Sequence, residues 1–329
     1  MMKWLKRILL SILGFVLCLI IIGFTYEHIS RFYIKRKIPI NGVLIDIGDH
    51  KLNLKLKGTG KPLVVFESGL DAGGSLVWGK VQDEISKTTS TASYDRAGIL
   101  WSERGNNPKT GEAMARELYT LLKKANQNGP YLLVGHSLAG YIIRSFVAKY
   151  PSEVLGIVLV DVSHPEQFQR FPKEIKALSS MPPDWIIKFA NSIGIVRLFY
   201  TGQYPNTLKT DSINIINNSY LPISLAAASE ENKNLEALAK EAGKITSFGN
   251  IPLVVITGTS ESRRNEYPTK ELGLKVEKIW MEMQTELLEL SANSEHVLAS
   301  KSSHYVQLEQ PEIVIESIRK LLREVADTI

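Results

Sequence analysis

The chain has 329 residues, of which 44% are hydrophobic and 22% are charged. This length allows one large α/β domain or two small ones, and the composition is that of a folded globular protein. The formal net charge of +5 is mild, and no basic stripe is interleaved with aromatic residues, so we expect no nucleic acid partner. With Cys18 as the single cysteine, the chain has neither internal disulfides nor a cysteine-based metal site.

The first forty residues have the pattern of a membrane anchor. A basic group at residues 3–7 precedes an uncharged stretch over 8–26, and a bilayer core requires roughly 20 mostly apolar helical residues. No small-x-small cleavage motif follows, so we predict an uncleaved anchor and linker over 1–40 rather than a signal peptide. A second basic group lies at 31–37, but the first is closer to the apolar run. We therefore expect a single-pass protein with its N-terminus in the cytoplasm and its catalytic domain outside it.

From residue 42 onward, segments with strand patterns alternate with segments of helical periodicity. The expected strands cover residues 42–48, 50–58, 62–69, 91–98, 131–135, 154–162, 251–258 and 296–300. The expected helices cover residues 77–87, 110–126, 138–149, 271–291 and 311–326. This alternation predicts an α/β fold with a mostly parallel sheet and helices on both faces.

The alternation is interrupted between residues 163 and 249. This stretch has helix-like pieces and several prolines, Pro222 among them, that we expect to break helices. We interpret 163–249 as a helical cap inserted after the sixth strand. The core would then consist of residues 41–162 and 250–329.

Ser137 lies in GHSLAG, between a predicted strand and a predicted helix. Small residues on both sides allow a tight turn that exposes the serine hydroxyl, as in the Gly-x-Ser-x-Gly nucleophile elbow. Here Ala139 replaces the second glycine, and Gly140 follows. On these residues the body of the chain, about 42–326, resembles a serine hydrolase of the α/β-hydrolase fold superfamily.

The resemblance implies a catalytic triad in the chain order serine, acid, histidine. His304 lies between a short strand and a helix, where the family places its base, although Ser303 replaces the usual glycine. Two acids are possible: Asp161, which closes the strand after the nucleophile helix, and Glu261 in ITGTSES, after a later strand. We prefer Asp161, because VDVSHPEQF resembles a branch whose later loop lacks an aspartate.

Further residues acquire roles from the same resemblance. The backbone N–H groups of Leu70, in VVFESGL, and of Leu138 would bind the oxyanion. Asp95 and Arg96, in SYDRAG, would brace the loops around the site. We expect His136 to make packing or lid contacts rather than to act as a second base.

These residues predict a membrane-anchored serine hydrolase that cleaves a carboxylic ester through a Ser137 acyl-enzyme, without metal or cofactor. Its substrate would be a small-molecule or lipid-like ester, reached with the protein held at the membrane by its N-terminal helix. An amide or peptide hydrolase of the aminopeptidase type is one alternative, and a catalytically silent binding protein is another. Dehalogenases and epoxide hydrolases are disfavoured because their nucleophile is an aspartate.

Overall fold

The computed structural model describes residues 2–178 and 182–326 and contains one sheet of eight strands. The strands are β1 (Val43–Asp46), β2 (Lys51–Lys57), β3 (Leu63–Glu67), β4 (Thr91–Tyr94), β5 (Tyr131–His136), β6 (Val154–Val160), β7 (Leu253–Gly258) and β8 (Ser294–Ala299). Their order in the sheet is β1-β2-β4-β3-β5-β6-β7-β8. β2 pairs antiparallel with β1 and β4, and the other neighbouring pairs are parallel. The expected mostly parallel sheet is confirmed.

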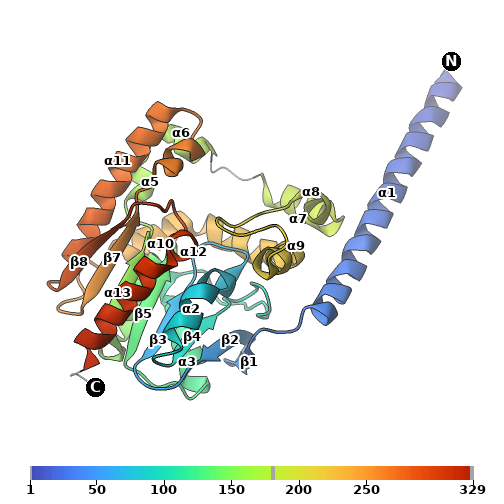
Figure 1. Ribbon diagram of the computed structural model, residues 1–329. Helices are drawn as coiled ribbons and strands as arrows, with labels where there is room; N and C mark the ends of the chain where they lie inside the picture. The colour runs from blue at the N-terminus through green and yellow to red at the C-terminus, as the bar shows by residue number, and fades with distance from the viewer. Residues whose placement is uncertain (1, 179–181, 327–329) are drawn as a thin grey trace.

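Helices cover both faces of this sheet (Figure 1). The helices of the core are α2 (Gly79–Ile85), α3 (Gly111–Lys124), α4 (Ala139–Lys149), α11 (Lys270–Glu286), α12 (Val306–Glu309) and α13 (Pro311–Glu324). Short 3₁₀ helices add η1 (Gly74–Trp78), η2 (Pro151–Glu153), η3 (Glu261–Glu266) and η4 (Leu287–Leu290).

Successive side chains of a strand point to opposite faces of the sheet, and helices cover both faces, so the central strands are buried on both sides. In β3, Val65 packs in the cluster that includes side chains of α3 and α4. Its neighbours Val64 and Phe66 pack in the cluster that includes α2 and α13. β5, β6 and β7 alternate in the same way, which explains why their sequences are continuous apolar runs.

Helices occupy the chain between β6 and β7. They are α5 (Gln167–Arg170), α6 (Lys173–Leu178), α7 (Asp184–Ser192), α8 (Ile195–Phe199), α9 (Ser212–Lys233) and α10 (Leu235–Ala242). The expectation that Pro222 breaks a helix is wrong, because Pro222 lies inside α9. The Pro222 carbonyl accepts hydrogen bonds from Arg31 and Asn191, at 2.9 and 2.8 Å, so side chains of α1 and α7 tie this turn of α9 to neighbouring helices.

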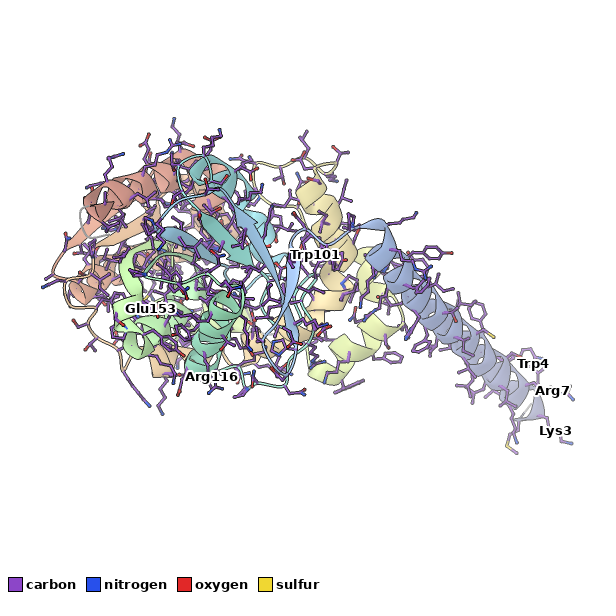
Figure 2. The ribbon with its side chains drawn as sticks, turned by 90° about the horizontal axis from the view of Figure 1, so that it is seen from below. Lys3, Trp4, Arg7, Trp101, Arg116 and Glu153 are labelled. Carbon is purple, nitrogen blue, oxygen red and sulfur yellow. The ribbon has the colours of Figure 1, made fainter. Side chains whose placement is uncertain are left out.

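The helix α1 (Met2–Lys37) projects from the domain, with Lys3, Trp4 and Arg7 at its far end (Figures 1 and 2). Among the described residues it is the one helix long and apolar enough to cross a membrane. Helical structure continues eleven residues past Tyr26, the end of the uncharged stretch, up to Lys37. Residues that we expected to form a linker therefore belong to the same helix.

Candidate active site

Ser137 occupies a tight turn between the end of β5 and the start of α4. Its φ angle is +54°, in the left-handed region that a residue with a side chain adopts at a cost of roughly 1–2 kcal/mol. The backbone holds it there, because the Ser137 carbonyl accepts hydrogen bonds from the N–H groups of Gly140 (3.1 Å) and Ser163 (2.9 Å). Strain of this kind persists where the surrounding structure enforces it, and it is concentrated at functional sites.

Gly135 and Gly140 lie near Ser137 at positions that leave little room for a side chain. A Cβ atom on Gly135 would lie 2.4 Å from Cδ1 of Ile143. A Cβ atom on Gly140 would lie 2.8 Å from Cβ of Val162. The glycines of GHSLAG thus permit close contact between strand and helix, which is what the elbow pattern requires.

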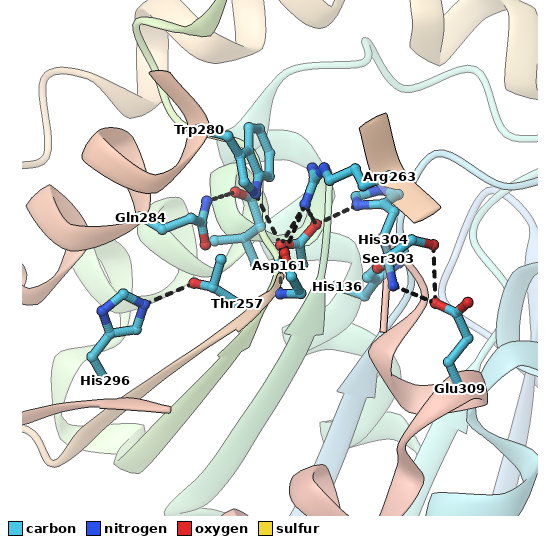
Figure 3. A network of polar contacts seen from close by, with 12 residues as sticks. His136, Asp161, Thr257, Arg263, Trp280, Gln284, His296, Ser303, His304 and Glu309 are labelled. Carbon is cyan, nitrogen blue, oxygen red and sulfur yellow. Dashed lines mark hydrogen bonds and ion pairs between the residues drawn. The ribbon is translucent and has the colours of Figure 1, made fainter. Parts of the chain in front are cut away.

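His304 and Asp161 lie next to each other although 143 positions separate them in the chain. Asp161 directly follows β6, and His304 lies in the loop between β8 and α12. The His304 Nδ1 atom is 2.7 Å from Asp161 Oδ2 (Figure 3). Because a carboxylate accepts, Nδ1 carries the proton and donates, which leaves Nε2 as the basic nitrogen of the ring.

Asp161 is fully buried and accepts four further hydrogen bonds from three residues (Figure 3). The donors are the Gly258 N–H (3.1 Å), the Trp280 Nε1–H (2.9 Å) and Arg263 Nη1, which reaches both carboxylate oxygens (3.1 and 2.9 Å). Burial alone would raise the pKa of Asp161. The charge of Arg263, together with the hydrogen bond from His304, instead holds this pKa well below its usual range, so Asp161 is ionised.

Arg263 and Trp280 are site residues that no sequence pattern predicted. Both contact the carboxylate of Asp161. The guanidinium of Arg263 also lies 4.6 Å from the centre of the Trp280 ring. They approach Asp161 from η3 and α11, and no short motif connects positions so far apart.

Glu261, the alternative acid, has a different environment. Its side chain is 85% exposed and pairs with Arg264 at 3.1 Å, one turn along η3. The geometry therefore brings Asp161, and not Glu261, to the ring of His304.

His136 lies beside this pair and is buried. Its ring centre is 4.5 Å from that of His304, and its Nε2–H donates to the His304 backbone carbonyl at 2.9 Å. Burial, and then the proximity of His304, lower the pKa of His136 to about 3. His136 is therefore neutral and holds the His304 backbone, as expected of a packing contact.

The segment that follows β3 lies against the Ser137 turn. A Cβ atom on Gly69 would be 2.9 Å from Cβ of Ser137, so the next residue, Leu70, begins beside the nucleophile candidate. Leu70 and Leu138 belong to the same apolar cluster. This proximity is the arrangement in which two backbone N–H groups could address one oxyanion.

Arg96 holds the same segment through hydrogen bonds to its backbone. Its guanidinium donates to the carbonyls of Ser68 and Gly69, both at 2.6 Å, and it pairs with Glu67 (2.8 Å) and Glu231 (2.7 Å). All of these contacts are buried. Arg96 thereby links the ends of β3 and β4 to α9.

Among the residues that the structure describes, one cluster has ligand types suited to a metal: His164, Glu166 and Glu286, whose candidate atoms lie within 4.8 Å of one another. Arg170 already donates to both carboxylate oxygens of Glu286, at 2.7 and 2.6 Å. Because an arginine supplies the positive charge there, we assign no metal to this cluster.

The protein belongs to the α/β hydrolase fold family, since the family's sequence model matches residues 62–262, more than half of the chain. YbdG of Bacillus subtilis is 28% identical over 50% of this chain and 51% of its own length. An AB hydrolase superfamily protein of Gibberella zeae is 26% identical over 80% of this chain and 87% of its own. The chain therefore spans about half of YbdG and most of the fungal relative.

The fold is also shared with a solved structure, a thermophilic esterase from Thermogutta terrifontis. That structure superposes with a TM-score of 0.54 at 19% identity, covering 86% of this chain and 98% of the esterase. A likeness at this identity establishes the fold, and activity has to be argued from the site.

Proposed function

We propose that the protein is a serine hydrolase that cleaves a carboxylic ester through an acyl-enzyme on Ser137, with His304 as base and Asp161 as acid. The observation that carries this proposal is the 2.7 Å contact between His304 Nδ1 and a buried, ionised Asp161, located beside the Ser137 turn. A serine hydroxyl is a weak nucleophile until a neighbouring base removes its proton, and this contact orients such a base.

In the acylation step, Ser137 Oγ attacks the carbonyl carbon of the ester and His304 Nε2 takes the hydroxyl proton. Asp161 stabilises the imidazolium that forms, without itself becoming protonated. The N–H groups of Leu70 and Leu138 bind the oxyanion, where one donor is worth on the order of 3 kcal/mol. The carbon–oxygen bond to the leaving group then breaks, and the imidazolium gives its proton to the departing alcohol.

Deacylation reverses these roles with water as the nucleophile. His304 Nε2 takes a proton from the water as its oxygen attacks the acyl carbon. The bond to Ser137 Oγ breaks, the proton returns to Oγ, and the carboxylic acid leaves. Side chains and backbone amides of this chain perform every step, so the proposed reaction requires neither metal nor cofactor.

Labelling with a fluorophosphonate probe tests the nucleophile. We expect the purified protein to be labelled, Ser137→Ala and His304→Ala to lose labelling, and Ser262→Ala, an exposed serine of η3, to retain it. Labelling that persists in folded Ser137→Ala protein would show that another residue reacts. Folded wild-type protein that neither labels nor hydrolyses esters would indicate a binding protein instead.

Chromogenic substrates test the bond that is cleaved. We expect p-nitrophenyl esters to be hydrolysed at rates that depend on the length of the acyl chain. The matched p-nitroanilides should be hydrolysed much more slowly. Faster cleavage of the anilides than of the matched esters would instead establish an amide hydrolase.

We further propose that α1 is an uncleaved membrane anchor with the catalytic domain outside the cytoplasm. The length and apolar composition of α1 support a membrane span. Its continuation past Tyr26 into the folded domain supports an anchor that is not cleaved. Alkaline phosphatase fused after Ile329 should be active in a bacterial host, where it folds only after export. If the phosphatase fusion is inactive and GFP fused at the same position is fluorescent, the catalytic domain lies in the cytoplasm and the proposed orientation is wrong.

A further inference from the structure

One face of α1 contacts the domain, and this face is built into the helix sequence. The half-buried or buried residues of α1 recur every three or four positions, the spacing of one helix face: Ile20, Gly23, Glu27, Ser30, Arg31 and Ile34. The other described residues of α1 are exposed. Figure 1 shows α7 and α8 lying alongside the middle of α1. The helix is thus attached to the domain along a specific stripe.

A buried carboxylate fixes this attachment. The Glu27 side chain is fully buried and accepts from Arg197 of α8, through Nε at 2.7 Å and Nη2 at 3.0 Å. Arg31 adds a third bond at 2.7 Å. Since a buried charge without its partner is strongly destabilising, Glu27 and Arg197 commit α8 to this position on α1.

Close backbone contact occurs one turn earlier. A Cβ atom on Gly23 would lie 2.4 Å from the carbonyl oxygen of Ile193, so only glycine allows the junction of α7 and α8 to approach α1 here. Gly194 adopts a φ angle of +77° at that junction, and a Cβ atom on it would lie 3.2 Å from Cδ1 of Tyr26.

These contacts set the height of α7 and α8 along α1. The uncharged stretch of α1 ends at Tyr26, and the α7–α8 junction meets the helix at Gly23 and Glu27, on either side of that end. If residues 8–26 cross the hydrocarbon core, the junction lies where hydrocarbon gives way to head groups.

The two short helices that meet α1 here expose large apolar side chains. The exposed fractions are 69% for Trp185, 47% for Phe189, 58% for Leu198 and 81% for Phe199. We call these four residues the cap apolar face. Tryptophan is enriched at the membrane–water boundary, and interfacial helices bury tryptophan, phenylalanine and leucine side chains at the head-group level.

We propose that the cap apolar face is a membrane-docking surface that inserts into the head-group layer of the bilayer crossed by α1. The proposal rests on the anchor proposed above and extends it: the protein would contact lipid through two elements, a spanning helix and the cap. The carboxylate of Glu27 and the guanidinium of Arg197 hold these elements in register. A surface of lipid, rather than a second protein, is the occupant because the anchor itself brings the bilayer to this face.

Depth-dependent fluorescence quenching tests the proposal on the full chain in phosphatidylcholine–phosphatidylglycerol vesicles. Cys18→Ser removes the single native cysteine, and Phe199→Cys then introduces one site for an environment-sensitive NBD label. Glu289→Cys, at an exposed position of the 3₁₀ helix η4, provides the matched control. With lipids carrying a doxyl quencher near the head group, we expect the signal at residue 199 to fall at least twofold and that at 289 to stay unchanged.

Equal quenching at residues 199 and 289 would overturn the proposal. So would a residue 199 label that is shielded from aqueous iodide but not quenched by doxyl lipid, because a protein, such as a second copy of this chain, would then cover the face. Quenching requires no turnover, so this result is independent of the proposed hydrolase activity.

A kinetic measurement gives a second readout. In the double variant Leu198→Ser, Phe199→Ser, we expect kcat/KM for a long-chain ester embedded in vesicles to fall several-fold. For soluble p-nitrophenyl acetate it should remain at the wild-type value. Equal decreases in kcat/KM for both substrates would argue against a role of this face at the bilayer. If the wild type hydrolyses neither substrate, the hydrolase proposal is wrong, and the quenching measurement still tests membrane docking.

Discussion

Asp161 and Glu261 carry the same charge in opposite environments. Asp161 is buried against His304, and Glu261 is exposed and pairs with a neighbouring arginine. We expect Asp161→Asn to lower kcat by on the order of 10³- to 10⁴-fold, because an amide neither stabilises the imidazolium nor fixes the ring tautomer. Glu261→Gln should leave kcat within about twofold of wild type, since an exposed pair contributes little.

Steady-state hydrolysis of one p-nitrophenyl ester by the two variants checks this comparison. Both variants should first be shown to unfold cooperatively on heating, as the wild type does, because Asp161→Asn also leaves Arg263 without its counter-charge. Loss of turnover in Glu261→Gln with retention in Asp161→Asn would transfer the acid role to Glu261.

His136 should make stability depend on pH. Its pKa is lowered to about 3 in the folded protein, against about 6.5 in an unfolded chain, so between these values the unfolded state binds more protons. The free energy of unfolding therefore falls as pH decreases through this window. By pH 4.5 the loss from this one group is about 2–3 kcal/mol, at 1.36 kcal/mol per pH unit.

Urea unfolding in non-ionic detergent at pH 7 and pH 4.5 measures this loss, with His136→Gln as the reference. Other titrating groups cancel in the comparison, so the wild type should lose more stability than the variant on acidification. Parallel losses in the two proteins would mean that residue 136 is not the titrating group.

At the residue scale, the sequence predicted contacts that follow from short patterns. Ser137 follows from its small neighbours, and Asp161 and His304 follow from the family's chain order. Arg263 and Trp280 could not be predicted in this way, because each reaches Asp161 from an element more than 100 positions further along. Only the packing of α11 against η3 and β7 brings them to the carboxylate.

At the scale of elements, the site depends on the contact between the segment after β3 and the turn after β5. Gly69→Ala would place a methyl group 2.9 Å from both Cβ of Ser137 and Nδ1 of His136. We expect the two segments to separate and kcat to fall by roughly 10²-fold, since a displacement of about 1 Å can have that effect.

Gly79→Ala is the matched control, because a Cβ atom on residue 79 meets nothing within 4 Å. It should preserve kcat and KM, and alanine in α2 favours the helix. Wild-type kcat in folded Gly69→Ala protein would show that the two segments do not act together.

The regular elements were largely predictable because their patterns are local. Continuous apolar runs give the central strands, and α3 and α13 have apolar residues at helical spacing. The helix α9 was not predictable, because Pro222 disfavours it locally, whereas the hydrogen bonds that tie it to neighbouring helices are donated by Arg31 and Asn191, which lie on α1 and α7.

At the scale of the whole molecule, α1 is part of the fold as well as a candidate anchor. Composition alone predicts a span over 8–26, and it predicts nothing about where the helix attaches. Attachment depends on Glu27, whose partner Arg197 lies 170 positions away. The last turns of α1 and the residue after it also pack on the domain, where Ile34 and Ile38 contact the cluster around Trp101 and Tyr220.

Removing α1 should therefore destabilise the domain. A chain of residues 41–329 lacks Glu27 and also lacks Ile34 and Ile38, which pack on the cluster around Trp101 and Tyr220. Removing α1 lets water reach the guanidinium of Arg197, so the destabilisation comes from the lost pair and the lost apolar contacts together. We expect the 41–329 chain to melt below a chain of residues 20–329, which keeps the residues of α1 that contact the domain. In the same detergent, the 20–329 chain with Glu27→Gln keeps Arg197 covered but without its carboxylate. Breaking a buried pair in this way costs about 3–5 kcal/mol, and for a domain of this size each kcal/mol shifts Tm by about 2–4 °C, so this variant should melt on the order of 10 °C below the 20–329 chain. Identical Tm values for all three would show that α1 serves only to hold the protein at the membrane.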